Sequence, residues 1–343
     1  MSTQPPVLII AEAGVNHNGD LNQAKALIDA AAAAGADLVK FQTFSADKIV
    51  SRTAQKAAYQ QKNTGTEDTS QYAMLKRLEL SVDMHHELIQ YCKEKGIAFF
   101  STAFDTEGID FLHQLGFERF KVPSGEITNY PYLKRLAKLK LPVILSTGMA
   151  DLGEIEDALQ VLTSEGLDRS AIAVLHCNTE YPTPMQDVNL KAMLTIQQAF
   201  GVQVGYSDHT LGIEVPIAAV ALGATVIEKH FTLDRNLPGP DHRASLEPEE
   251  LKAMVQGIRN IELAVGGHGR KEPSDSEVQN KAVVRKSLHA QTLINENEVI
   301  SEKHLIPLRP GHGISPMDWK RVVGRKVSHT IQEGQLIKWT DLK

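Results

Sequence analysis

Two histidines lie at the ends of consecutive apolar segments in the second half of the chain. His209 directly follows the segment that begins at Val202, and His230 lies near the end of the segment that begins at Thr225. If these segments are neighbouring strands, two imidazole nitrogens can reach one divalent ion and leave its other positions to water and substrate, as in a catalytic metal site. The chain contains 13 histidines, so the plainer alternative is that each ring only makes a structural hydrogen bond.

Two lysines occupy similar positions in earlier segments. Lys40 lies in the segment from Asp37 and Lys121 in the segment from Phe117. Two ammonium groups beside hydroxyl groups form a pocket for phosphate or carboxylate. The alternatives are a lysine that extends to solvent or one that forms a Schiff base, and the histidine pair disfavours the Schiff base because a metal can polarise a carbonyl instead. The hydroxyl residues at neighbouring segment ends are Thr102, Ser124, Ser146 and Ser207.

Two carboxylates are the best-placed candidates for proton transfer. Glu12 and Glu126 each follow an apolar segment and could move a proton or hold substrate hydroxyls. The alternative is that they form structural ion pairs with Lys40 or Lys121. Cys177 ends an apolar segment, so we interpret it as a buried, inert thiol rather than a nucleophile.

The elements that must position these residues repeat one unit, a short apolar segment followed by an amphipathic stretch of helical period. Eight such units are typical of a parallel (β/α)8 TIM barrel, in which the strand ends meet on one face. A doubly wound sheet is the alternative, because the number of strands does not prove closure. The eight segments begin at Val7, Asp37, Ile97, Phe117, Leu141, Ala171, Val202 and Thr225.

The chain of 343 residues is predicted to consist of two domains of unequal length joined by a linker. We assign 1–268 to a barrel domain, the charged and Pro/Ser-containing segment 269–283 to a linker, and 284–343 to a small β-rich module. About 60 residues leave this module little core of its own, so we expect it to dock on another surface. The connection 45–81 is unusually long, and loops of that length are functional or disordered.

Composition narrows the class of protein. The chain is 42% hydrophobic and 23% charged with a net charge of −6, which indicates a globular protein and argues against a generally basic nucleic-acid binder. It contains no apolar stretch of membrane-spanning length and no signal-peptide pattern, so we expect a cytoplasmic protein with no membrane contact. Its two cysteines are expected to be reduced.

Nine motifs in order and register closely resemble the sialic acid synthase family, and the tail resembles its antifreeze-like (SAF) domain. The resemblance implies condensation of phosphoenolpyruvate with an N-acetylmannosamine-type sugar to a nine-carbon 2-keto acid, with phosphate released by C–O cleavage. It also implies a divalent metal cofactor, expected to be Mn²⁺, with Mg²⁺ or Co²⁺ as alternatives. The motifs are AEAGVNHNGD, VKFQTF, KVPSGE, ILSTGM, HCNTEYPTP, YSDHT, EKHFTLD, GPDHRASLEP and RPGHGISP.

The resemblance also implies roles for individual residues. His209 and His230 become the metal ligands, and Glu126 becomes a candidate for positioning or deprotonating a water, with its division of roles with Glu12 open. A homodimer is implied, in which the SAF domain covers the partner's barrel and Arg309 binds the sugar's acyl group there. Phosphoenolpyruvate is assigned to Lys40, Thr102, Lys121, Ser124, Ser146 and Ser207, with Asn178 or Thr179 as a further contact, and the sugar to Glu12, Gln42, Asn63, Glu126, Tyr181 and Asp241.

Several alternatives for the function stay open. The main expectation is an N-acetylneuraminate synthase, and the alternative is an N,N'-diacetyllegionaminate synthase that acts on 2,4-diacetamido-2,4,6-trideoxymannose. The segment 62–72 is compatible with either sugar. A metal-dependent 3-deoxy-heptulosonate-type synthase is disfavoured by the C-terminal module and the YPTP and RPGHG motifs. A non-enzymatic ice- or carbohydrate-binding protein is disfavoured by the many polar residues at the strand ends.

Overall fold

The computed structural model describes residues 5–64 and 69–343 and divides the chain into two compact units. The first unit is Met1–Gly267 and the second is His268–Lys343. The second unit includes the segment 269–283 that the sequence analysis treats as a linker. Part of this segment is helical, because α12 spans Asp275–Val284 behind a capping box formed by Ser274 and Glu277.

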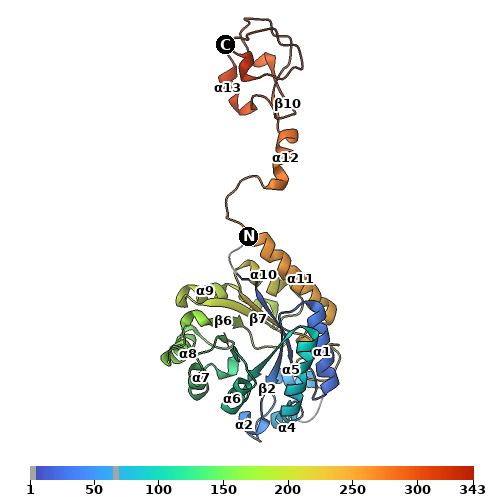
Figure 1. Cartoon of the computed structure of the whole chain (residues 1–343), viewed down its shortest axis with the longest axis vertical. Helices are drawn as coiled ribbons and strands as arrows, with labels where there is room; N and C mark the ends of the chain where they lie inside the picture. The colour runs from blue at the N-terminus through green and yellow to red at the C-terminus, as the bar shows by residue number, and fades with distance from the viewer. Residues whose placement is uncertain (1–4, 65–68) are drawn as a thin grey trace. The chain divides into compact units, whose positions relative to one another are not determined.

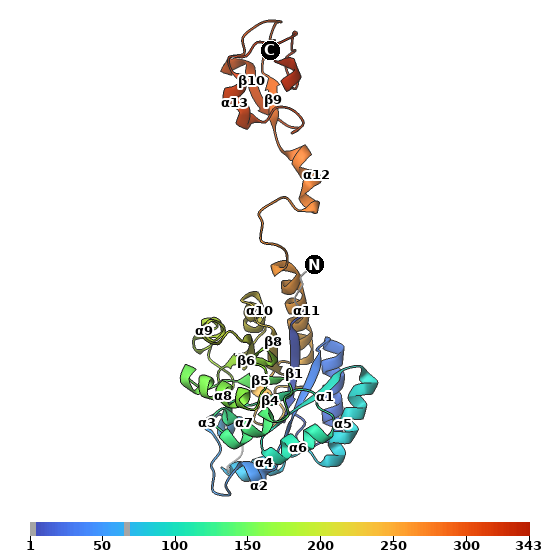
Figure 2. The same ribbon diagram turned by 60° about the vertical axis from the view of Figure 1, so that its left-hand side comes forward.

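The first unit is built on eight parallel strands (Figures 1 and 2). Their order is β3-β2-β1-β8-β7-β6-β5-β4, and β3 and β4 at the two ends also lie next to each other, so the sheet forms a nearly closed barrel. This arrangement confirms the predicted (β/α)8 fold. The strands are β1 (Leu8–Gly14), β2 (Leu38–Thr43), β3 (Ala98–Ala103), β4 (Phe120–Val122), β5 (Val143–Ser146), β6 (Ile172–Cys177), β7 (Gln203–Asp208) and β8 (Val226–His230).

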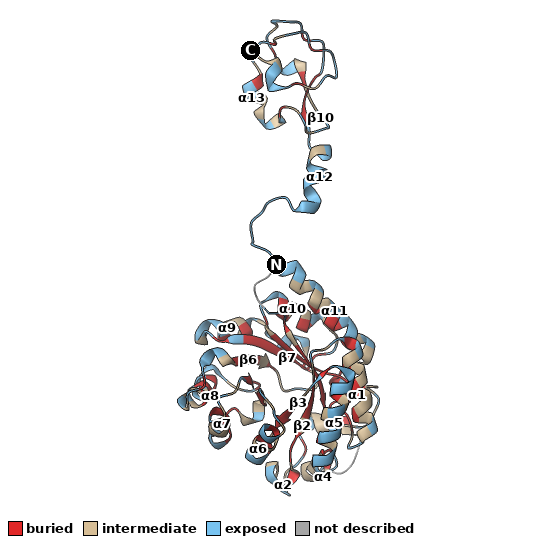
Figure 3. Cartoon of the chain, viewed as in Figure 1, coloured by how far each residue is buried: buried red, intermediate tan, exposed pale blue. Residues whose placement is uncertain are grey.

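Helices surround the barrel and turn their buried faces toward it (Figure 3). The first of them shows why the sequence folds this way, because Asp20 caps its N-terminus and Gly35 ends it with a φ of 80° that favours glycine. None of the described helices combines the length and the hydropathy that a membrane span requires. The helices are α1 (Leu21–Ala34), α5 (Val82–Lys95), α6 (Thr106–Gln114), α7 (Tyr130–Ala137), α8 (Leu152–Ser164), α9 (Lys191–Phe200), α10 (Glu214–Ala221) and α11 (Pro248–Val265).

The long connection between β2 and α5 is more ordered than expected. It contains three short helices, α2 (Ala46–Ile49), α3 (Ala58–Thr64) and α4 (Gln71–Lys76). Helices this short are not stable alone, and an apolar cluster that includes Phe44 and Met74 holds the connection against the barrel. Residues 65–68, within the segment that we considered compatible with either sugar, lie outside the described residues.

The side chains inside the barrel are apolar at one end of its axis and polar at the other. Successive side chains of a strand point to opposite sides, so Val226, Glu228 and His230 of β8 face inward while Ile227 and Lys229 face the helices. Toward the N-terminal ends of the strands the inward residues form an apolar layer. This layer consists of Ile10, Phe100, Ile144, Ala173, Leu175 and Val226. Above it the inward residues are charged or polar, so the candidate site lies at the carboxyl ends of the strands.

The second unit has its own apolar core. Strands β9 (Ser287–Ala290) and β10 (Leu305–Leu308) pair antiparallel, and α13 (Trp319–Val322) packs beside them. The expectation of little core was wrong, because single apolar residues from irregular segments meet in space without any periodicity along the chain. The buried core residues are Leu288, Ala290, Ile294, Ile300, Leu305, Ile314, Val322, Val327, Ile331 and Ile337.

The thiol of Cys92 gives a first prediction. Cys92 lies on α5 with 1% of its surface exposed, and burial raises its pKa to about 12. At pH 8 the thiol is therefore protonated, and thiols react as thiolates. We expect iodoacetamide to leave Cys92 unmodified in the native protein at pH 8 and at pH 9, and to modify it after unfolding in guanidinium, as measured by peptide mass spectrometry. Rapid modification of the native protein would contradict the structure.

Candidate active site

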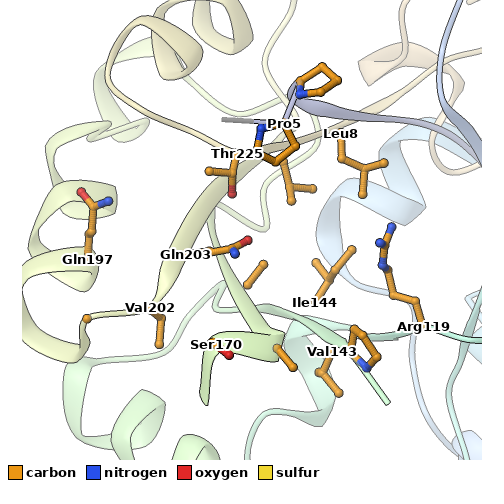
Figure 4. Close-up of a pocket in the computed structure, with 16 residues that line it drawn as sticks. Pro5, Leu8, Arg119, Val143, Ile144, Ser170, Gln197, Val202, Gln203 and Thr225 are labelled. Carbon is orange, nitrogen blue, oxygen red and sulfur yellow. The ribbon is translucent and has the colours of Figure 1, made fainter. Parts of the chain in front are cut away.

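Two cavities open at opposite ends of the barrel. The cavity at the N-terminal end has a volume of about 660 Å³, and among its described lining residues only Arg119 is charged (Figure 4). Apolar residues such as Val143, Ile144 and Val226 form much of its wall. The cavity at the carboxyl ends of the strands, of about 590 Å³, is lined by two lysines, carboxylates and two histidines. Only the second cavity combines groups for anion binding, proton transfer and metal binding, so we call it the catalytic pocket.

Two buried lysines and two buried glutamates form the floor of the catalytic pocket. Lys40 Nζ lies 2.9 Å from Glu12 Oε2 and 3.4 Å from Glu228 Oε2, and Lys121 Nζ lies 3.7 Å from Glu228 Oε1. Hydroxyl groups complete the network. Lys40 donates to Thr102 Oγ1 (2.9 Å), Lys121 donates to Ser146 Oγ (2.6 Å), and Ser207 Oγ donates to Glu228 Oε1 (2.9 Å).

The surroundings of the two carboxylates in this floor give them different pKa values. Burial raises the pKa of Glu12 to about 7, although Lys40 partly opposes it. Burial would also raise the pKa of Glu228, but Lys121 and Lys40 outweigh it and bring that pKa to about 2. Glu228 therefore stays ionised between the lysines, while Glu12 can gain or lose a proton near neutral pH.

The two lysines also differ from each other. Burial lowers the pKa of Lys121, and Glu228 opposes this only in part. For Lys40 the carboxylates of Glu12 and Glu228 outweigh burial and raise the pKa. An anion that enters the pocket would compete with these carboxylates for the ammonium groups, so the floor is suited to a phosphate or carboxylate ligand.

The two histidines at the ends of β7 and β8 face each other above this floor. Their ring centroids are 5.4 Å apart. Nδ1–H of His209 donates to the carbonyl oxygen of Asn178 at 2.5 Å, which leaves Nε2 with a free lone pair. Nδ1 of His230 is buried, has no hydrogen-bond partner among the described residues, and lies 4.0 Å from Asp241 Oδ2.

These histidines fit a divalent metal. Burial lowers the pKa of His209 to about 4 and that of His230 well below its usual range, so both rings are neutral ligands at neutral pH. Among residues 5–64 and 69–343, no group of three or more His, Cys, Asp and Glu side chains forms a metal site. Other ligands would have to come from water or substrate, which is the open coordination typical of a catalytic metal.

Aromatic rings and one glycine shape the space beside the histidines. The ring of Tyr181 stacks on His209 with centroids 4.1 Å apart, and Tyr59 stacks on Tyr181 at 5.0 Å. Gly14 has a φ of 52°, and a Cβ there would lie 3.3 Å from side-chain atoms of Glu12 and His230. The first β-to-α turn therefore requires glycine at this position.

Most of the predicted site residues meet in the catalytic pocket. Thr102 lies behind it, bonded to Lys40, and Asn63 Nδ2 donates to the carbonyl oxygens of Pro240 (2.8 Å) and Tyr181 (3.4 Å). Of the two residues left open in HCNTEYPTP, Thr179 lines the pocket. The predicted residues that line it are Glu12, Lys40, Gln42, Lys121, Ser124, Ser146, Tyr181, Ser207, His209 and His230.

Two further predicted site residues, Glu126 and Arg309, are not among the described residues that line the pocket. Glu126 is half-buried in a short 3-10 turn after β4, where its carboxylate accepts from Asn129 Nδ2 at 2.5 Å, and it is not among the described pocket-lining residues. Arg309 is exposed in the second unit. Conversely, Glu228 and Tyr59 line the pocket although neither was assigned a role from the sequence. The alternation of β8 places Glu228 on the same side of the strand as His230, because the two lie two residues apart.

The fold is a TIM barrel, and the pocket at the carboxyl ends of its strands is suited to an anionic ligand beside a candidate metal site. Comparison with known proteins identifies its family. The model of the NeuB family matches residues 27–270 and that of the SAF domain matches residues 285–343. The chain belongs to the NeuB family and carries a C-terminal SAF domain, as its sequence predicts.

Individual relatives indicate where in the family the chain lies. It is 55% identical to an N,N'-diacetyllegionaminic acid synthase of Campylobacter jejuni, over 96% of this chain and 98% of the relative, and 51% identical to one of Legionella pneumophila, over 98% and 94%. A solved N-acetylneuraminic acid synthetase of Leptospira borgpetersenii is 38% identical, with a TM-score of 0.69 over 80% of this chain and 90% of that one. The comparisons thus support the legionaminate alternative better than the main expectation of an N-acetylneuraminate synthase.

Proposed function

We propose that the protein is an N,N'-diacetyllegionaminate synthase, which condenses phosphoenolpyruvate with 2,4-diacetamido-2,4,6-trideoxymannose and releases phosphate. The observation that carries the reaction class is the buried floor of the catalytic pocket, where Lys40 and Lys121 meet Glu12 and Glu228. The choice of sugar is supported by the identities of 55% and 51% to two N,N'-diacetyllegionaminic acid synthases.

The lysines bind the enol phosphate in this proposal. Lys121 and Lys40 contact the dianionic phosphate or the carboxylate of phosphoenolpyruvate, and Ser146 and Ser207 donate further hydrogen bonds once these hydroxyls turn from their present partners. Because both lysines are buried, their charges act in a medium of low dielectric constant. The same charges stabilise phosphate as it leaves.

The sugar lies on the histidine side of the pocket. His209 and His230 would hold a divalent ion, for which Mn²⁺ is our candidate, and this ion would polarise the sugar aldehyde. Tyr181, Gln42 and the carboxylate of Asp241 surround the same space and could orient the sugar hydroxyl and acetamido groups.

The bond changes in this proposal follow from these positions. Carbon 3 of phosphoenolpyruvate attacks carbon 1 of the open-chain sugar, the C=O π bond of the aldehyde breaks to give an alkoxide, and carbon 2 gains oxocarbenium character. Water adds to carbon 2, and one of its protons passes through a base to the alkoxide. The adduct then collapses to a ketone as its C–O bond to phosphate breaks, and the hydroxyl proton leaves with phosphate. We assign the proton taken from this water to Glu12 rather than Glu126, because Glu12 lines the pocket and has a pKa of about 7.

Oxygen-18 water tests this reaction. The purified protein is incubated with phosphoenolpyruvate, the diacetamido sugar and Mn²⁺ in labelled water, and both products are analysed by mass spectrometry. We expect one phosphate for each nine-carbon acid formed, with the label at the ketone-derived carbon and none in phosphate. Label in phosphate would mean that the P–O bond breaks, and no sugar-dependent phosphate release would contradict the proposed reaction.

The SAF domain is proposed to complete the site of a second protomer. Arg309 is exposed on its own unit, and an exposed guanidinium is free to bind the acyl group of a sugar in a partner's barrel. We expect Arg309→Ala and Lys121→Met to be nearly inactive alone, and a mixture of the two to regain up to about a quarter of the wild-type activity by random pairing of protomers. The measurement is phosphate release after joint refolding. Confirmed heterodimers without activity would rule out the shared site.

A further inference from the structure

A charged pair lies buried directly behind the two histidines. Asp208 and Lys229 immediately precede His209 and His230, and both side chains are 0% exposed. They are partners in the register of β7 and β8, and Lys229 Nζ lies 2.5 Å from Asp208 Oδ2. Because the strands alternate, the histidines belong to the pocket side while this pair faces α10, which covers β7 and β8.

The pair also fixes the backbone around His209. Asp208 accepts from the backbone N–H of Thr210 at 3.1 Å and from its hydroxyl at 3.0 Å, and Lys229 donates to the carbonyl oxygen of Thr210 at 2.5 Å. His209 thus lies in a turn whose two flanking residues are both held. The same ammonium group links this turn to the strand that carries His230.

The attraction between the two charges does not by itself explain why this pair is present. Most neighbouring positions on the helix side of β7 and β8 are apolar, including Val204, Tyr206 and Ile227. Removing two charges from water costs more than their attraction returns in many proteins, and replacing such a pair by apolar residues of similar size is often neutral or stabilising. The pair does link the carboxyl ends of β7 and β8, and it thereby fixes the distance between these two ends.

We propose that Asp208 and Lys229 are positioning residues that hold His209 and His230 at the separation required to bind one divalent cation. This inference rests on the metal assignment of the proposed function. The geometry behind it is one hydrogen-bonded network, Asp208, Thr210 and Lys229, that contacts the chain on both sides of His209 and on the N-terminal side of His230. Residues of this kind behind metal ligands commonly change metal affinity by 10- to 100-fold when they are replaced.

The first test replaces the pair by apolar residues. We expect Asp208→Leu with Lys229→Met to fold with a lower thermal midpoint than the wild type, because the buried polar groups of Thr210 lose their partners, and to bind Mn²⁺ at least about tenfold more weakly by calorimetry. The electron paramagnetic resonance spectrum of its bound Mn²⁺ should also broaden, because the ligands become less ordered. The matched control is Asp110→Leu with Arg135→Met, which removes the pair between α6 and α7 and should leave Mn²⁺ affinity unchanged.

A milder pair of variants covers the case in which the double variant does not fold. Thr210→Val removes only the hydroxyl that donates to Asp208, and Thr210→Ser keeps it. We expect about fivefold weaker Mn²⁺ binding for the valine variant and recovery for the serine variant. Wild-type affinity in Thr210→Val or in the folded double variant would overturn the inference.

These measurements separate the inference from the proposed function. They use the full-length protein with Mn²⁺ alone, so they do not depend on which sugar or which reaction is correct. A wild-type protein that binds no Mn²⁺ would overturn the inference together with the metal assignment. A wild-type protein that binds Mn²⁺ but makes no sugar acid would contradict the proposed function and leave the positioning role supported by the variants.

Discussion

Replacement of Lys121 by methionine is expected to lower kcat/KM for phosphoenolpyruvate about a thousandfold. Lys121 is 3% exposed, donates to Ser146 at 2.6 Å and faces Glu228 at 3.7 Å. Methionine keeps most of its volume but removes the charge that would bind the incoming anion and stabilise phosphate as it leaves. The remaining lysine, Lys40, then has to neutralise both Glu12 and Glu228.

The measurement is the initial rate of phosphate release at several concentrations of phosphoenolpyruvate, with the sugar saturating. Lys138→Met serves as the control, because Lys138 is exposed after α7 and should behave like the wild type. Circular dichroism establishes that both variants are folded. A folded Lys121→Met variant with kcat/KM within about threefold of the wild type would show that the floor of the pocket does not bind the enol phosphate.

Replacement of His230 by glutamine should lower the rate of phosphate release by a similar factor, but through weaker metal binding rather than weaker anion binding. The buried Nδ1 of His230 has no hydrogen-bond partner in the described structure, and the neutral ring faces His209 at 5.4 Å. Glutamine retains a polar side chain but is a poor ligand for Mn²⁺. We expect Mn²⁺ binding to weaken at least about a hundredfold and phosphate release to fall about a thousandfold.

Both proteins are first freed of metal by chelation and dialysis, and the two readouts are calorimetry with Mn²⁺ and the phosphate assay after Mn²⁺ is added back. His113→Ala is a suitable control, because His113 lies on the exposed side of α6, remote from the pocket. If His230→Gln kept full activity in metal-free buffer, the histidine pair would not be a metal site, and the plainer alternative of two structural histidines would hold.

The sequence predicts the barrel well for a physical reason. Strands that are buried on both sides are short and continuously apolar, so their boundaries are visible without any long-range information. Their alternation also carries information about the site. Lys40 and Gln42 are two residues apart on β2, as are Glu228 and His230 on β8, and all four line the pocket. The alternation of β8 therefore also predicts a place for Glu228 in the pocket, although no role was assigned to it.

Other parts of the site depend on contacts that no local pattern reveals. Tyr59 reaches Tyr181 because an apolar cluster with Phe44 and Met74 anchors the long connection to the barrel. The motif around Glu126 follows β4 in sequence, but a 3-10 turn carries its carboxylate toward Asn129. The core of the SAF domain also cannot be predicted from hydrophobic periodicity. Its residues, such as Ile294 and Ile331, come from irregular segments that meet only in the folded structure.

A competition between two sugars tests the central claim most directly. N-acetylmannosamine and 2,4-diacetamido-2,4,6-trideoxymannose are supplied at equal concentration with limiting phosphoenolpyruvate, and the product acids are quantified by mass spectrometry. The product ratio then equals the ratio of the two kcat/KM values. We predict at least a tenfold excess of N,N'-diacetyllegionaminate, because one additional contact to the second acetamido group suffices for that preference. An excess of N-acetylneuraminate would contradict the assignment and restore the main expectation of an N-acetylneuraminate synthase.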